Sequence, residues 1–110
     1  MITIERWSKF SFAEQIGHVG SEISRARHWN EKNEPFSREN ALIRSIELID
    51  LTITAQSGKR SLKEIVRLRE VICDWLFEKK EYDVSLSSLQ KYCEAFYLSV
   101  QLKKTNSSVN

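Results

Sequence analysis

Apolar residues recur at helical spacing along most of the chain and predict four amphipathic helices. In the first of these stretches they follow alternating steps of four and three residues. Ser11 and Glu14, three positions apart, have the spacing of a capping box. We therefore predict a first helix over residues 12–32. The residues expected on its buried face are Phe12, Ile16, Val19, Ile23 and Ala26.

A second helix is predicted after the segment EKNEPFSREN, which holds the only proline of the chain. Ser37 is the candidate N-cap, and Gly58 is the expected end. The apolar residues expected on its buried face are Ala41, Leu42, Ile46, Leu48, Ile49 and Ile53.

Two further helices follow in the second half of the chain. Ser61 and Glu64 repeat the capping-box spacing and open the third helix, which should end near Lys79 or Lys80. Its expected buried residues are Leu62, Ile65, Leu68, Ile72, Trp75 and Leu76. Ser85 is the candidate N-cap of the fourth helix. The residues expected on its buried side are Leu86, Leu89, Cys93, Phe96 and Val100.

These four helices predict an all-α fold, an antiparallel up-down-up-down four-helix bundle, because short connections join antiparallel neighbours. The bundle should occupy residues 1–102 as one domain and leave 103–110 as a disordered tail. A short irregular lead-in over residues 1–10 is either extended or lays Trp7 and Phe10 over one end of the bundle. Only 3 Gly and 1 Pro in 110 residues agree with few turns.

Charge and cysteine content narrow the class of protein only slightly. The formal net charge of +2 does not by itself indicate a nucleic-acid partner, although the excess of basic residues lies in the second half of the chain. Cys73 and Cys93 sit within apolar helical patterns and are expected to be reduced core thiols. We expect a cytoplasmic protein, because the chain lacks both the pattern of a secretory signal and an uncharged apolar run of about 20 residues.

A strip of small residues runs beside the buried face of the first helix. Each mid-helix glycine costs about 1 kcal/mol relative to alanine, so glycines at this density indicate a close approach by another group. A neighbouring helix is the expected group, and a second subunit or a small ligand are alternatives. The strip consists of Ala13, Gly17, Gly20 and Ser24.

One arginine falls on an apolar side of a predicted helix. Arg69 shares its side of the third helix with apolar residues, and a buried guanidinium needs a carboxylate partner. We predict Glu22 as that partner and Asp50 as the second choice. Alternatively, only the stem of Arg69 packs and its head reaches solvent.

Two surfaces are candidates for interactions. Ile43 and Leu51 project from the charged side of the second helix and could form an oligomer interface. A basic strip at the start of the third helix could contact phosphates or RNA, although no aromatic residue stands among its members to stack on bases. The basic strip consists of Lys59, Arg60, Lys63 and Arg67.

The stretches GSEISRA and LKEIVRLREVICDW, within a small helical chain, resemble short bacterial four-helix proteins of the HEPN group. Members that cleave RNA carry an Arg followed, after roughly four to six residues, by a His, and neither His18 nor His28 has such an Arg. The resemblance therefore implies a non-catalytic partner of a small nucleotidyltransferase in a toxin–antitoxin-like pair. A second resemblance is to oligomeric bundles that serve as accessory subunits for RNA or a reverse transcriptase.

No established catalytic or metal-binding motif is present in the sequence, whether a Gly-rich phosphate loop, HExxH, Cys/His metal spacing or a Glu-x-x-His pair. We therefore expect no cofactor and no metal. The prediction is a non-catalytic protein-interaction module that binds a protein partner or a second copy of itself, with RNA as a further candidate. The enzyme alternative is an atypical ribonuclease that uses His18 or His28 with Arg25.

Overall fold

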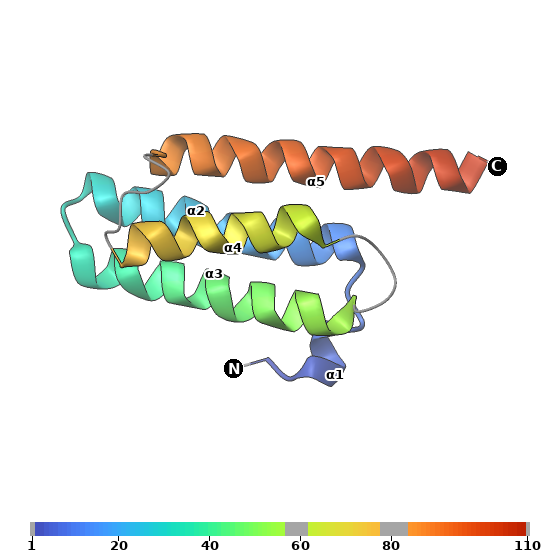
Figure 1. Ribbon diagram of the computed structural model, residues 1–110, viewed down its shortest axis with the longest axis horizontal. Helices are drawn as coiled ribbons and strands as arrows, with labels where there is room; N and C mark the ends of the chain where they lie inside the picture. Colours follow the sequence, from blue (N-terminus) through green and yellow to red (C-terminus); the bar gives the residue numbers. More distant parts are fainter. Residues whose placement is uncertain (1, 57–61, 78–83, 110) are drawn as a thin grey trace.

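The computed structural model describes residues 2–56, 62–77 and 84–109, with side chains as far as Leu102. Throughout this part the chain forms helices and no strands, so the predicted all-α class is confirmed. The helices are α1 (Ile4–Trp7), α2 (Phe12–Glu31), α3 (Pro35–Ala55), α4 (Lys63–Leu76) and α5 (Leu86–Val109) (Figure 1).

Helix α2 begins and ends where local chemistry satisfies its free backbone groups. The predicted capping box is confirmed: the Ser11 hydroxyl accepts from the amide of Glu14 at 3.1 Å, and a Glu14 carboxylate oxygen accepts from the amide of Ser11 at 2.8 Å. After Glu31 the chain enters the left-handed region at Asn33, with φ 58°. Asparagine tolerates this conformation better than most residues, so α2 ends here.

The predicted start of α3 was wrong. The helix begins at Pro35, and its N-cap position is held by Glu34, three residues before the expected cap Ser37. Proline suits the first helical position because it lacks the amide that would be unsatisfied there and its φ is already helical. The choice of Ser37 as the capping residue therefore placed the predicted start of this helix too late.

Only some of the predicted boundaries of α4 and α5 lie within the described residues and can be compared with the structure. Ser85 caps α5 as expected, because its hydroxyl accepts from the amide of Ser88 at 3.0 Å. Leu62 holds the N-cap position of α4, and the other predicted boundaries, Gly58, Ser61 and Lys79–Lys80, lie outside the described residues. Helix α5 continues to Val109, so it includes most of the segment 103–110 that was expected to be a tail.

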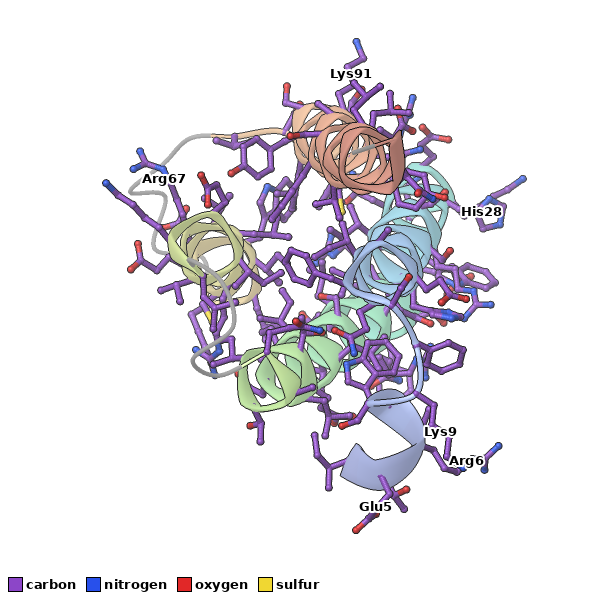
Figure 2. The ribbon with its side chains drawn as sticks, turned by 90° about the vertical axis from the view of Figure 1, so that its right-hand side faces the viewer. Glu5, Arg6, Lys9, His28, Arg67 and Lys91 are labelled. Atoms are coloured by element: carbon purple, nitrogen blue, oxygen red, sulfur yellow. The ribbon has the colours of Figure 1, made fainter. Side chains whose placement is uncertain are left out.

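Helix α2 is the central element of the fold. It packs against α3 on one side and α5 on the other, while α4 packs mainly against α3. Viewed along the helices, α5, α2, α3 and α4 surround a common core (Figure 2). The core contains the predicted apolar residues of all four long helices, among them Ile16, Ile23, Ile49, Ile72 and Leu89. Helical periodicity therefore identified the buried faces correctly.

The lead-in is not irregular, which corrects the prediction. Residues Ile4–Trp7 form the single-turn helix α1, which packs on α3. Trp7 is only 2% exposed, and its indole Nε1–H donates to the Thr52 hydroxyl at 2.9 Å. The buried amide of Gln15 donates to the carbonyl of Trp7 at 3.0 Å and accepts from Gln56 at 3.2 Å. The N-terminus is thereby fixed to one end of α2 and α3.

Several large apolar side chains remain on the surface. They come from α3, from α4 with its C-cap, and from α5, and each is at least 40% exposed. Among the described residues, no helix is both long and apolar enough to cross a membrane. The exposed residues are Phe36, Ile43, Val66, Phe77, Tyr92, Leu98 and Leu102.

Candidate functional site

A concave surface with mixed chemistry lies between α4 and α5. We call it the seam groove; its volume is about 420 Å³. The indole of Trp75 on α4 donates to the carbonyl of Val84, which is one of the lining residues. Aliphatic side chains form most of its lining, and a guanidinium, a phenol and a serine hydroxyl complete it. The lining residues are Arg67, Leu68, Val71, Val84, Ser88, Leu89 and Tyr92.

Tyr92 connects the two walls of the seam groove electrostatically. Burial raises the pKa of its phenol, Glu64 on α4 acts in the same direction, and Arg67 opposes both. The hydroxyl is therefore protonated at neutral pH and available as a hydrogen-bond donor. No aromatic residue stands among the basic ones in the sequence of α4. Tyr92 was not predicted at this surface, because it belongs to a different helix and no signal in the sequence indicates that the two helices bring these residues together.

The basic strip is only partly described. Lys63 and Arg67 are exposed on α4, whereas Lys59 and Arg60 lie outside the described residues. Figure 2 shows Arg67 projecting outward from the upper side of α4. Within the described residues Arg67 makes no salt bridge, unlike the other arginines of the long helices, which all do. One cation of the predicted strip is thus placed at the rim of a groove.

The strip of small residues faces α5. A Cβ at Gly20 would lie 3.3 Å from the Cys93 sulfur, and a Cβ at Gly17 would lie 3.4 Å from the Tyr97 ring. Ala13 is buried. The expected reason for the strip, close approach of a neighbouring helix, therefore holds. Gly17, Gly20 and Ser24 also line a second, more open groove of about 500 Å³ between α2 and α5.

For Arg69 the first-choice partner Glu22 was wrong, and the second choice, Asp50, is confirmed. Its guanidinium forms a two-pronged ion pair with Asp50, with Nε–Oδ1 at 2.7 Å and Nη2–Oδ2 at 3.3 Å. Both side chains are 40% or more exposed, so the pair lies on the surface between α3 and α4. Glu22 is buried, and it pairs with Arg25 at 2.6 Å and Arg44 at 3.2 Å. It therefore joins α2 to α3 electrostatically.

The apolar residues of α5 occupy two opposite sides of the helix. Leu89, Cys93 and Val100 face the core. At about 100° per residue, the outer α5 face, which we define as Ala95, Leu98 and Leu102, falls on the other side. Leu98 is 59% and Leu102 65% exposed. This face was not predicted, because only the apolar residues expected on the buried side of the fourth helix were considered.

The two residues that were predicted as an oligomer interface differ in exposure. Ile43 is 41% exposed on α3, whereas Leu51 is half-buried. Neither reaches the exposure of Leu98 and Leu102. The outer α5 face is therefore the more accessible apolar surface.

Comparisons with protein-family models, with curated proteins and with solved structures found no match to this chain. The chemistry of its own residues therefore carries the functional argument. Among the described residues, no group of three or more His, Cys, Asp or Glu side chains is arranged to hold a metal ion.

The histidines of the ribonuclease alternative lie apart from each other. His18 packs against Phe10 and Trp7, with ring centroids 4.9 and 5.6 Å away. His28 lies ten residues further along α2, about 15 Å away along the helix axis, and its ring is 4.9 Å from that of Trp29. Arg25 is engaged by Glu22. The three side chains do not share a cleft among the described pockets.

The two free thiols should differ strongly in reactivity. Cys93 is 1% exposed, and burial raises its pKa to about 12, while Cys73 is half-buried beside Arg69. Because the thiolate is the nucleophile, we expect a thiol reagent at pH 8 to modify Cys73 at least about a hundredfold faster than Cys93. Mass spectrometry of timed samples measures both rates.

Unfolding the protein is the control for this labelling experiment. In denaturant both thiols should react at similar rates, because burial no longer distinguishes them. Equal rates in the native protein would contradict the packing of Cys93 against Gly20.

Proposed function

We propose that the chain is a non-catalytic protein-interaction module, built as an antiparallel up-down-up-down four-helix bundle that pairs with a second copy of itself. The observation that carries this proposal is the outer α5 face. A helix that is apolar on two sides is normally covered on both. The core covers only the inner side of α5, and the outer side carries Leu98 and Leu102 at 59% and 65% exposure.

The chemistry of this face suits a symmetric contact. Leu98 and Leu102 are one turn apart, and the small side chain of Ala95 allows another helix to approach closely. A two-fold axis beside Leu98 places the face against itself, as symmetric dimers require. The formal net charge of only +2 opposes such pairing weakly. Figure 1 shows the C-terminal end of α5 extending beyond the ends of the other helices.

Light scattering of purified protein over a wide concentration range tests the proposal. The wild type should form dimers, and the double substitution Leu98→Ser with Leu102→Ser should weaken dimerisation at least about tenfold, because it removes the apolar area that drives association. Circular dichroism checks that the variant keeps its helices.

The matched control is Phe36→Ser, which removes a 75% exposed aromatic from α3 instead of α5. It should dimerise like the wild type. A wild type that stays monomeric at every concentration would contradict the proposal, as would a double variant that dimerises normally. Loss of dimers in Phe36→Ser alone would move the interface to α3.

In this role the dimer presents its remaining surfaces to another protein. The resemblance to the HEPN group suggests a small nucleotidyltransferase as the class of that partner. The accessory role for RNA is a second candidate, and the exposed cations Lys63 and Arg67 favour it.

A further inference from the structure

The seam groove is a site where the bundle lacks helix-to-helix packing. Helix α4 is held mainly by α3 and α5 by α2, whereas the helices α4 and α5 make little direct backbone contact among the described residues. Most long helices in a bundle pack closely against two neighbours. The space between α4 and α5 is instead a groove of about 420 Å³.

The floor of the groove is preformed and apolar. Leu68 and Leu89, one from each helix, are 1% and 2% exposed, so neighbouring residues already hold them in place. Val71 and Val84 extend the aliphatic lining. A ligand that fits this floor needs aliphatic or aromatic groups of its own, because polar groups would lose their hydration here without finding hydrogen-bond partners.

The rim supplies one positive charge and two hydroxyl groups. Arg67 makes no salt bridge within the part of the chain that the structure describes, although Arg25, Arg44 and Arg69 each pair with a carboxylate. Tyr92 stands on the other side with a protonated phenol. Arginine and tyrosine are enriched among residues that dominate protein interfaces, and arginine binds carboxylates in a two-pronged geometry.

We propose that the seam groove binds one amphipathic helix of a partner protein, with a carboxylate of that helix paired to Arg67. Each wall spans one to two helical turns, which suits two or three apolar side chains at helical spacing on the bound helix. The aliphatic floor formed by Leu68 and Leu89 favours a helix over RNA, because a phosphate backbone offers no apolar groups to pack against it. The inference rests on the proposed role in protein interaction but uses a surface separate from the outer α5 face.

A displayed library of short amphipathic peptides, selected against the full chain, supplies the probe. We expect the selected peptides to carry an acidic residue beside apolar residues spaced three or four apart. Arg67→Glu and Tyr92→Ala should each weaken binding of the best peptide at least about tenfold. In NMR spectra the amide shifts should change mainly along residues 67–71 of α4 and along residues 84–92, which lead into α5 and form its first turns.

The matched control is Lys91→Glu, which makes the same change of charge one position from Tyr92 but on a side chain that projects away from the groove (Figure 2). It should bind the peptide like the wild type. The double variant at Leu98 and Leu102 should also bind normally. The two proposals can therefore fail separately. A wild type that stays monomeric but binds the peptide would contradict only the proposed dimer, and a wild type that dimerises but binds no peptide would contradict only this inference.

Three results would overturn the inference. The first is a selection that yields no binding peptide, and the second is peptide binding that Arg67→Glu leaves unchanged. The third is salt-sensitive binding of a single-stranded RNA oligonucleotide that Arg67→Glu abolishes while peptides do not bind, which would assign the groove to RNA.

Discussion

Replacing Trp7 by alanine is expected to lower the free energy of unfolding by about 3–5 kcal/mol, the range for removal of a buried Trp or Phe side chain. Trp7 is 2% exposed although it belongs to a helix of only four residues. Its loss would leave a cavity at the end of α3 and remove the indole donor of Thr52. Denaturant unfolding followed by circular dichroism measures the change without depending on tryptophan fluorescence.

Trp7→Phe separates packing from hydrogen bonding at this position. It keeps an aromatic ring but cannot donate to Thr52, so we expect a smaller loss of about 1–3 kcal/mol. A loss below about 1 kcal/mol for Trp7→Ala would show that α1 detaches from the core independently of global unfolding. That outcome would contradict the close attachment described here.

Replacing Ile23 by alanine is expected to cost about 2–5 kcal/mol of unfolding free energy. Ile23 is fully buried on α2, the helix that packs against both α3 and α5. A cavity at this position removes contacts in the centre of the core, where the surrounding helices cannot close it easily. Thermal or denaturant unfolding measures the loss.

Ile43→Ala is the matched control, since it makes the same chemical change at a site that is 41% exposed. At low protein concentration it should change stability by less than about 0.5 kcal/mol. Equal losses at Ile23 and Ile43 would contradict the assigned orientation of α2 and α3.

Helical periodicity predicted the inner faces of the four long helices because a side chain's direction around a helix depends only on its own position. The same reasoning could not find α1, since four residues are too few to show a period. It also predicted Arg69 as an inward-facing residue with Glu22 as the first-choice partner, whereas Arg69 is 40% exposed and pairs with Asp50. Direction around one helix does not determine which neighbouring helix lies opposite.

The candidate site depended on which helices lie next to each other, and the periodicity of a single helix does not contain that information. Arg67 was identified from the sequence as a basic surface residue, but its position at the rim of a groove depends on α5. Tyr92 is 25 residues away in the chain, and only the packing of the helices brings the two together. The outer α5 face could have been found from the sequence, because Leu98 and Leu102 are one turn apart and fall opposite the core residues.

The attachment of α4 mainly to α3 has a consequence for local motion. A helix held by one principal neighbour can separate from the core at a lower free-energy cost than one held by two, so backbone amides of α4 should exchange with solvent before those of α2. A molecule bound between α4 and α5 stabilises only the closed form and slows this exchange by mass action. The protein would then be most resistant to proteolysis when its partner is present.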